Sequence, residues 1–523
     1  KPIQATRAFT SLLPPLESTP SFLVTKANKS YRHQYSNIYF IRLRLLRKFL
    51  EERALSLWQN VSGKPVLVPR VLEVVKGQLC YIIGTVYMEM PLKPNVMIDL
   101  ARDHSIPPPP PPTKFYSDND NVMLEDESGR IRLVGDVLKG KNLVTGVIIS
   151  ALGLETPGGD FEVADICFAG LAPQALKEVG DEEDAMDVDG TSSPSEDEWI
   201  GLVSGLDVGS NTPTDAQLQM LTEYLTGEEG GEDDQLGSAK ISRLIIAGNS
   251  LAAGVLDNRI ETPTYAERKA KKRGLDPTTF EVNPIYELSA HLLDIARVMP
   301  IHVLPGPGDP SGTIMPQQPF PGAIFGDAST KFSTFYSESN PTYINIASTS
   351  QPNCKRSILI NSGQPLNDMF KYLPSPPITR LSILESTLKW RHMSPTAPDT
   401  LWCHPYFSSD PFILRETPHI YVIGAQPEFG TKLVTEETKD GEKIQSRIIL
   451  LPSFSKTGTL VMVNVRTLDV RRVLQHFGIL LVAYVFFFLV EPEQQLSSSH
   501  DEPLLSAPDP DADSDMIDSQ QGL

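Results

Sequence analysis

The chain has 523 residues, of which 46 are Lys or Arg and 65 are Asp or Glu, and its formal net charge is -19. Ten acidic residues lie within 178–198 and nine within 491–523, with no Lys or Arg in either stretch, so the rest of the chain carries 46 acidic against 46 basic residues. This balance argues against a nucleic-acid binder with a strongly basic body and leaves room only for a local basic patch.

The N-terminal part predicts a flexible arm followed by a helix. Residues 1–33 are rich in Pro, Ser and Thr and predict the arm. Over 34–62, apolar and basic residues alternate at helical spacing, which predicts an amphipathic helix that needs a partner surface. Its apolar positions are Ile38, Ile41, Leu45, Leu46, Phe49 and Leu50, and its basic positions are Arg42, Arg44, Arg47 and Lys48.

Short β-type runs replace the helical pattern over 66–175. Turn-forming segments separate them, and six consecutive prolines at 107–112 lie in a long connection. The predicted strands cover 71–75, 79–87, 122–125, 131–135, 146–152 and 161–168. Five or six short strands in about 100 residues predict a small Greek-key barrel such as an OB-fold. Its aromatic residues are not interleaved with basic ones, so we expect core and interface roles for them rather than stacking on nucleic-acid bases.

The acidic run at 178–198 predicts a linker, because it cannot bury enough apolar surface to order itself. Over 199–473, apolar strands alternate with helices. Strands are expected at 199–204, 243–247, 301–304, 343–346, 357–360, 419–423, 448–452 and 460–465, with helices ending near 226, beginning at 283 and spanning 378–390. This alternation predicts a layered α/β domain, so the whole chain is an α+β multidomain protein. In such domains the loops at the carboxyl ends of the strands carry any chemistry.

The strand-end loops have a recurring order of residues. They read 204–210 (SGLDVGS), 247–250 (AGNS), 305–309 (PGPGD) and 424–427 (GAQP). In this order they resemble the metal-binding loops of calcineurin-like phosphoesterases, whose motifs are Asp-x-His, Gly-Asp, Gly-Asn-His-Asp/Glu and Gly-His-x-His. A two-metal site of that family needs a bridging carboxylate and several His ligands.

The resemblance implies that the metal ligands are lost. The first Asp position falls on Gly205 and its His on Asp207, the bridging Asp on Asn249, the Asn-His pair on Pro307 and Gly308, and the last two His on Ala425 and Pro427. Only Asp207, Asn249 and Asp309 remain as oxygen donors. We therefore expect a phosphoesterase-like domain that keeps its loop turns without metal, cofactor or catalysis. An active phosphoesterase or nuclease is the alternative.

A barrel followed by such a domain resembles the B subunits of replicative DNA polymerases. Within that group, one segment closely resembles the small subunit family of DNA polymerase delta, and further stretches agree at 143–146, 165–174, 315–319, 408–413 and 418–421. The segment runs from Arg391 and His392 through Met393 to Ser394, Pro395, Thr396, Ala397, Pro398 and Asp399. The resemblance extends from about residue 31 to 473. The B subunit of another replicative polymerase is a further alternative, which this signature segment disfavours.

The resemblance implies a noncatalytic scaffold in the nucleus, with roles in DNA replication and repair. It implies that the chain joins the carboxyl-terminal metal-binding module of the polymerase delta catalytic subunit to a third subunit, and that it is shared with the polymerase zeta catalytic subunit. The chain has no sliding-clamp motif of the Gln-x-x-Leu/Ile-x-x-Phe-Phe type, so contact with the clamp is expected mainly through partners. DNA contact is expected to be weak or indirect.

Three further signals remain. The basic residues Arg268, Lys269, Lys271, Lys272 and Arg273 predict a nuclear localisation signal or a solvated helix face. Residues 474–523 form an atypical tail, whose 14-residue apolar run at 477–490 would rise only about 21 Å as a helix. It predicts a buried or interfacial segment, or a wrongly assigned exon, and no membrane span. Four cysteines without a Cys-x-x-Cys pair predict a reducing compartment without structural zinc or disulfides.

Overall fold

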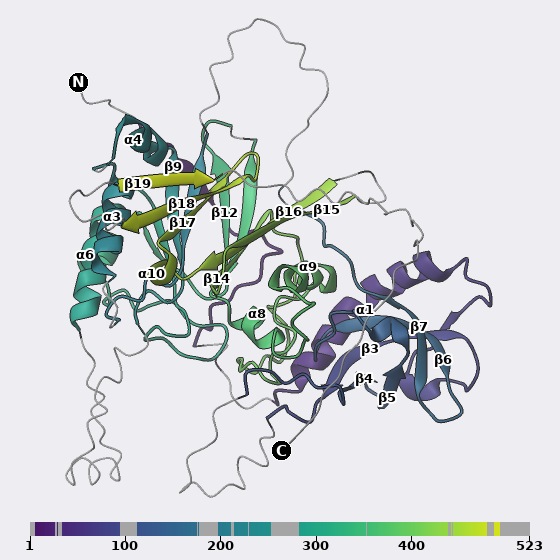
Figure 1. Cartoon of the computed structure of the whole chain (residues 1–523). Coiled ribbons are helices and arrows are strands. Elements are labelled where there is room, and N and C mark those ends of the chain that lie inside the picture. Colours follow the sequence, from purple (N-terminus) through teal and green to yellow (C-terminus); the bar gives the residue numbers. More distant parts are fainter. Residues whose placement is uncertain are drawn as a thin grey trace, which may run out of the picture.

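The computed structural model describes residues 6–26, 29, 34–94, 112–174, 176, 197–210, 214–228, 230–252, 282–351, 353–437, 441, 443–477 and 486–491. Most of the predicted acidic linker, the basic run at 268–273 and the tail beyond 491 lie outside these residues. A small barrel from the first part of the chain lies beside a larger layered domain (Figure 1). None of the described helices is long and apolar enough to cross a membrane.

The barrel is a closed sheet, as its strand pattern predicts. The sheet order is β2-β3-β4-β5-β7-β6, and β3 also pairs with β6. Its elements are β2 (Val66–Leu67), η1 (Val71–Glu73), β3 (Cys80–Glu89), β4 (Asn121–Glu125), β5 (Arg130–Val134), η2 (Asp136–Leu138), β6 (Ile148–Glu155) and β7 (Phe161–Cys167). The strand predicted at 71–75 is wrong and is the 3-10 turn η1 instead. Its backbone N–H groups at Val71 and Leu72 donate to the side chains of Asp126 (2.7 Å) and Ser128 (3.3 Å), which replace a strand partner.

The predicted amphipathic helix is α1 (Asn37–Trp58), and it packs on the barrel. Its buried side chains include one at every fourth position, namely Ile38, Arg42, Leu46, Leu50, Ala54 and Trp58. Residues separated by four lie on one face of a helix, so this series forms a continuous stripe. Phe49, expected on the apolar face, is instead exposed.

The larger domain consists of two sheets packed face to face. The order of the first is β1-β12-β13-β14-β16-β15, and that of the second is β11-β10-β9-β8-β17-β18-β19. The first contains β1 (Thr10–Leu13), β12 (Thr342–Ser348), β13 (Lys355–Asn361), β14 (Ile420–Gln426), β15 (Gly430–Glu437) and β16 (Lys443–Pro452). The second contains β8 (Trp199–Val203), β9 (Ile241–Ala247), β10 (Ile301–Leu304), β11 (Phe335–Ser337), β17 (Thr459–Asn464), β18 (Val470–Phe477) and β19 (Phe486–Glu491).

Helices cover the outer faces of both sheets, which gives a helix-sheet-sheet-helix arrangement (Figure 1). Aliphatic side chains of β8, β9, β13, β14 and β16 form the core between the sheets. The helices are α3 (Asp215–Thr226), α4 (Glu232–Ala239), α6 (Asn283–Ala296), α7 (Asp327–Lys331), α8 (Gln364–Met369), α9 (Arg380–Trp390) and α10 (Phe454–Thr457). The apolar faces of α3 and α6 pack on the second sheet, while α8 and α9 pack between the first sheet and the barrel.

The N-terminal arm is part of this domain rather than the loose segment that its composition predicts. β1 pairs antiparallel with β12, with Thr10 opposite Ser348. Arg7 donates to the carbonyl oxygens of Leu225, Ser238 and Ile241 at 2.6 to 3.0 Å. The buried Arg243 donates from Nη2 to the carbonyl oxygen of Thr10 (2.8 Å). Buried charges need such partners, so the arm supplies an acceptor for Arg243 inside the domain.

The domain also extends beyond the predicted boundary at residue 473. β18 continues to Phe477, and β19 pairs antiparallel with it, with Phe477 opposite Phe486. Part of the apolar run at 477–490 is therefore a strand of the second sheet.

Candidate functional site at the strand-end loops

The predicted strand-end loops meet at one edge of the domain. β8, β9 and β10 are parallel neighbours, so their carboxyl ends lie together. The Gly205 N–H donates to the carbonyl oxygen of Gly248 (3.0 Å), and the Asp207 N–H donates to that of Asn249 (3.1 Å). Asn249 Oδ1 in turn accepts the Gly308 N–H at 2.9 Å. These contacts join three of the four loops.

The loop after β14 joins the others through a serine. The Ala425 N–H donates to Ser204 Oγ (2.8 Å), and this hydroxyl donates to the carbonyl oxygen of Ala247 (2.8 Å). Pro307 and Pro427 are exposed, and Pro427 lines a separate open hollow with Pro452 and Arg472. Six of the eight predicted loop residues therefore lie within the hydrogen-bonded cluster, and the two prolines lie at its surface.

The two carboxylates of the loops are engaged by hydrogen bonds within the chain. Asp309 Oδ1 accepts the Leu251 N–H (2.8 Å), and its Oδ2 accepts the Gly306 N–H (2.7 Å). Burial raises the pKa of Asp309 to about 6, although these backbone N–H groups act in the opposite direction. Asp207 Oδ2 accepts the hydroxyls of Ser453 (3.0 Å) and Ser455 (2.6 Å).

Neutral amide side chains surround these loops. Gln317 Nε2 donates to the carbonyl oxygen of Gly306 (3.1 Å), and Gln317 Oε1 accepts from Asn340 Nδ2 (2.7 Å) and from Gln364 Nε2 (2.7 Å). The Ser362 N–H donates to Asn340 Oδ1 at 3.0 Å. We call Asn249, Gln317, Asn340 and Gln364 the amide network. All four side chains are neutral: Gln317, Asn340 and Gln364 bond to one another, while Asn249 and Gln317 bond to the backbone of the loops.

The loop backbones adopt conformations that restrict their sequence. Asp207, Asn249 and Ala425 have positive φ angles of 49°, 54° and 50°, which is uncommon for residues other than Gly. A Cβ atom on Gly306 would lie 2.4 Å from the nitrogen of Asn249. Strained backbone of this kind concentrates at functional sites and persists only where the surrounding structure enforces it. Across the described residues, no group of three or more His, Cys, Asp or Glu side chains is arranged to hold a metal ion.

The signature segment lies away from these loops, at the junction of the barrel and the larger domain. Arg391, the residue that follows α9, has a φ of 57° and donates to the carbonyl oxygens of Gly170 (2.9 Å) and Leu171 (2.8 Å). His392 Nε2 lies 2.9 Å from Asp410 Oδ2, and the Ser394 N–H donates to His392 Nδ1 at 3.1 Å. The histidine therefore accepts at Nδ1 and donates from Nε2 to the carboxylate.

Arg42 of α1 connects this segment to the barrel. Its side chain and that of Asp410 are fully buried, and its Nε donates to Asp410 Oδ2 at 2.8 Å. Its Nη atoms donate to the carbonyl oxygens of Gly146 (3.1 Å), Pro395 (2.7 Å) and Ala397 (2.9 Å). One guanidinium thus contacts the barrel, the signature segment and a buried carboxylate at the same time.

The charges of this junction are strongly coupled. Burial alone would raise the pKa of Asp410, but the Arg42 charge outweighs that effect and holds this pKa well below its usual range. Burial and the Arg42 charge lower the pKa of His392 to about 4, with Asp410 partly offsetting them. Asp399, the last residue of the segment, accepts from Lys93 Nζ (2.6 Å) and Tyr372 OH (3.1 Å).

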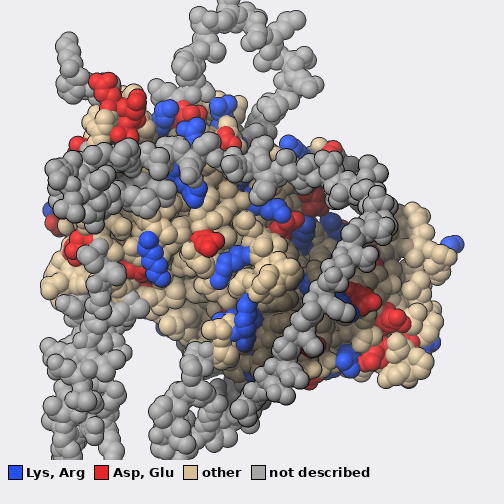
Figure 2. Space-filling view, in the orientation of Figure 1, with Lys and Arg blue, Asp and Glu red and all other residues tan. Residues whose placement is uncertain are grey.

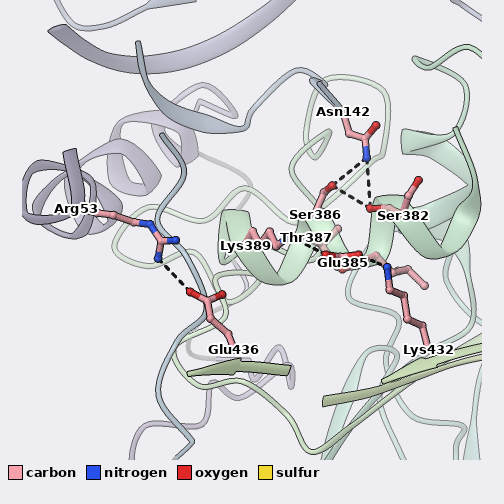
Figure 3. A network of polar contacts seen from close by, with 10 residues as sticks. Arg53, Asn142, Ser382, Glu385, Ser386, Thr387, Lys389, Lys432 and Glu436 are labelled. Atoms are coloured by element: carbon pink, nitrogen blue, oxygen red, sulfur yellow. Dashed lines mark hydrogen bonds and ion pairs between the residues drawn. The ribbon is translucent and has the colours of Figure 1, made fainter. Parts of the chain in front are cut away.

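A second polar network crosses the same junction (Figure 3). Asn142 of the barrel donates to Ser386 Oγ of α9 at 2.9 Å. On the other side of α9, Glu385 accepts from Lys389 and from Lys432 of β15. The helix is therefore held by polar contacts to both domains.

Several residues of the site and the junction were not among the predicted ones. The sequence pattern predicts Arg42 on the basic face of the helix, whereas the structure places it in the buried stripe at every fourth residue. That spacing is the signal in the sequence that points to its burial. Asp410 and the amide network carry no local pattern in the sequence, because their partners are far away along the chain.

Comparison with known proteins agrees with this architecture. A family model described as the DNA polymerase delta subunit OB-fold domain matches residues 34–166, and one described as the B subunit of DNA polymerase alpha/epsilon matches residues 200–431. The first match confirms the predicted OB-fold.

Full-length relatives match most of the chain. It is 36% identical over 436 residues to a DNA polymerase delta small subunit of Arabidopsis thaliana, which covers 83% of this chain and 90% of that protein. It is 31% identical over 489 residues to that of Saccharomyces cerevisiae, with coverages of 87% and 92%. It is 31% identical over 443 residues to the DNA polymerase delta subunit 2 of Drosophila melanogaster, with coverages of 85% and 93%. The chain therefore belongs to the DNA polymerase delta small subunit family, whose members are accessory subunits of a DNA polymerase in DNA replication.

Proposed function

We propose that the chain is a noncatalytic scaffold subunit of the DNA polymerase delta complex, and that its larger domain is a calcineurin-like phosphoesterase fold without metal ligands. The observation that carries this proposal is the amide network at the strand-end loops. In the phosphoesterases that these loops resemble, the loops carry two metal ions, whereas here Asn249 bonds to Gly308 and Gln317 bonds to Gly306.

The residues present do not fit a two-metal centre. Such a centre needs a bridging carboxylate and several His or carboxylate ligands. Asn249 at the bridging position is neutral, both oxygens of Asp309 accept backbone N–H groups, and Asp207 accepts two hydroxyls. These loops are therefore interpreted as structural, and no reaction step is assigned to them.

We propose that the chain joins the carboxyl-terminal metal-binding module of the catalytic subunit to the third subunit, and that it serves the polymerase zeta catalytic subunit in the same way. In this proposal it works in the nucleus in replication and repair, and it reaches the sliding clamp mainly through its partners. Exposed aromatic side chains support protein interfaces: Trp402 is 71% exposed and Phe407 59% exposed, both just beyond the signature segment.

Co-purification tests the scaffold role. The chain is co-expressed with the catalytic and third subunits of polymerase delta from the same organism, and the complex is examined by gel filtration. We expect a stable three-chain complex, and we expect the catalytic subunit to leave it when its carboxyl-terminal module is deleted. A chain that elutes free of both subunits would contradict the scaffold proposal.

The enzymatic alternative is tested with Mn²⁺ as the probe. Calorimetric titration of the purified chain should give no stoichiometric binding of two ions, and a labelled DNA strand should not be cleaved. Cleavage by the wild-type chain that is abolished by Asp309→Ala would establish an active phosphoesterase or nuclease instead.

A second candidate function is that of the B subunit of another replicative polymerase. The match of residues 200–431 to the family model of the alpha/epsilon polymerases favours it. Carboxyl-terminal modules of the alpha, delta and epsilon catalytic subunits can be offered together to the immobilised chain. Retention of the delta module alone is expected, and preferential retention of another module would favour this second candidate.

A further inference from the structure

Two basic side chains lie against one phenylalanine at the end of α8. Lys114 Nζ is 3.7 Å from the centre of the Phe370 ring, and Arg380 Cζ is 4.5 Å from it. Lys371, the next residue in the chain, has its Nζ 5.5 Å from the ring of Phe115. We call Lys114, Phe370, Lys371 and Arg380 the cationic cluster.

The positive charge of this cluster is poorly compensated. Within the described parts of the chain, no carboxylate lies within ion-pair distance of Lys114 or Arg380, and Lys371 Nζ is 3.8 Å from the buried carboxylate of Asp368. Burial and the neighbouring charge of Arg380 both lower the pKa of Lys114. Burial also lowers the pKa of Arg380. An anion placed here would relieve this repulsion.

Neutral acceptors hold the cations in position without cancelling their charge. Lys114 Nζ donates to the carbonyl oxygens of Phe370 (2.5 Å) and Leu373 (2.9 Å). Arg380 Nη1 donates to Asn367 Oδ1 (2.6 Å) and Gln426 Oε1 (2.8 Å). Among the described residues, these hydrogen bonds of Arg380 use Nη1 only, so Nε and Nη2 keep donors for a further acceptor. Such fixed donors suit the oxygen atoms of a phosphate group.

The surroundings of the cluster are also basic. Figure 2 shows Lys and Arg side chains gathered in the central part of this face, around α8, β14 and α10, where acidic side chains are sparse. The contact of Arg380 with Gln426 places the cluster beside the strand-end loops. The overall neutrality of the folded body therefore conceals a local basic surface.

We propose that the cationic cluster contacts a backbone phosphate of DNA held by the polymerase complex. The choice of DNA rests on the proposed function, because a polymerase complex presents DNA phosphates to its subunits. The ring of Phe370 is occupied by cations, so the cluster is suited to bind phosphate rather than to stack on a base. A phosphate contact of this kind does not read the DNA sequence.

Salt-dependent binding tests the proposal. The affinity of the full-length chain for a fluorescent DNA duplex is measured over a series of salt concentrations, both alone and in complex with the catalytic subunit. For Lys371→Gln combined with Arg380→Gln, we expect the slope of log affinity against log salt to become shallower by about 1 for each lost cation. At low salt the affinity should fall about threefold or more for each cation.

A matched control removes the same charge elsewhere. Lys139→Gln combined with Lys331→Gln affects side chains that are 83% and 59% exposed, and it should leave the salt slope unchanged. Because Arg380 also contacts Gln426, its replacement could disturb the structure as well as remove a charge. Two single variants, Arg380→Lys and Lys371→Gln, are therefore measured as well, and their melting temperatures check that they fold. Both should fold; Arg380→Lys should retain most of the affinity because it keeps the charge, whereas Lys371→Gln should make the slope shallower by about 1.

The outcomes separate this proposal from the scaffold proposal. A folded cluster variant with the wild-type slope would overturn the phosphate contact, even if the complex with the catalytic subunit is intact. Binding of a phosphoserine peptide without binding of DNA would also overturn it. Failure to co-purify with the catalytic subunit would contradict the scaffold role instead. The salt dependence of DNA binding by the isolated chain would then decide the phosphate contact.

Discussion

Arg42 is the residue on which the junction between the two domains depends most. Its removal in Arg42→Ala would leave the Asp410 carboxylate buried without its guanidinium, and would leave three backbone carbonyls without a donor. Breaking a buried ion pair in this way costs about 3–5 kcal/mol of unfolding free energy. Denaturant unfolding should show this loss, whereas Arg44→Ala, at an exposed position of the same helix, should change the stability by less than about 0.5 kcal/mol. Equal effects of the two substitutions would contradict this role.

His392 makes the junction sensitive to acid. Its pKa is about 4 in the fold against an ordinary value of 6.5, so between these values the unfolded chain binds a proton that the folded chain does not. The unfolding free energy must therefore fall as the pH falls from 6.5 towards 4, by up to about 1.4 kcal/mol per pH unit. His419, whose pKa burial and the Arg356 charge lower to about 3, acts in the same direction.

The substitution His392→Gln tests the assignment. It should reduce the pH dependence of the unfolding free energy between pH 6.5 and 4 by close to one proton, measured by denaturant titration at several pH values. The remaining dependence should combine His419, which acts in the same direction, with Asp309, whose raised pKa of about 6 acts in the opposite direction. An unchanged slope in the variant would show that His392 is protonated in the fold.

At the scale of single residues, sequence reasoning identified the strand-end loops more readily than the groups that stabilise them. Asp207, Asn249 and Asp309 lie in the loops that follow apolar strands, so their positions could be predicted from local pattern. Gln317 and Asp410 could not, because a hydrogen-bond partner distant in sequence leaves no periodic signal. The burial of Arg42 was detectable in principle from the every-fourth-residue stripe, but the usual exposure of arginine argued against it.

Among the connecting elements, the turn before β6 packs against the signature segment with almost no free space. Gly146 has a φ of 91°, and a Cβ atom there would lie 1.9 Å from the carbonyl oxygen of Pro395 and 2.5 Å from Arg42 Nη1. Gly140 has a similar φ of 83° but has nothing within 4 Å of the same position.

Comparing alanine substitutions at these two glycines therefore separates the cost of backbone strain from the cost of the clash with Pro395 and Arg42. Both Gly146→Ala and Gly140→Ala incur the strain of a positive φ, but only the first also forces the domains apart. Thermal unfolding should show Gly146→Ala to be less stable than Gly140→Ala by about 1–3 kcal/mol. Equal melting temperatures would mean that the junction adjusts without cost.

Whole elements were predicted well where periodicity is local. The barrel strands and helices α1, α6 and α9 follow patterns of two or about 3.6 residues, and these patterns do not require knowledge of distant partners. The N-terminal strand β1 was missed, because four residues in a Pro- and Ser-rich arm become a strand only by pairing with β12. The turn at 71–73 was missed because Asp126 and Ser128 satisfy its backbone from another strand.

At the scale of the molecule, the two domains share one apolar core. A single cluster of buried side chains runs from Ile82 and Leu124 of the barrel, through Leu384 and Leu388 of α9, to Tyr421 of the first sheet. A continuous core of this kind couples the stability of its parts, because unfolding either domain exposes apolar surface on the other. This coupling suits the scaffold role proposed above, since partners bound to different domains would keep a fixed geometry.

The shared core predicts that the barrel and the larger domain unfold together. Calorimetry of the wild-type chain should give one cooperative transition whose van't Hoff and calorimetric enthalpies agree. Arg42→Ala and Gly146→Ala disturb contacts that cross the junction but leave the shared apolar core in place, so each should lower the melting temperature of a transition that stays single. Arg44→Ala should leave the melting temperature nearly unchanged. Two resolved transitions in the wild-type chain would mean that the domains are independent, and that the polar contacts of Arg42 and α9 orient them without coupling their stability.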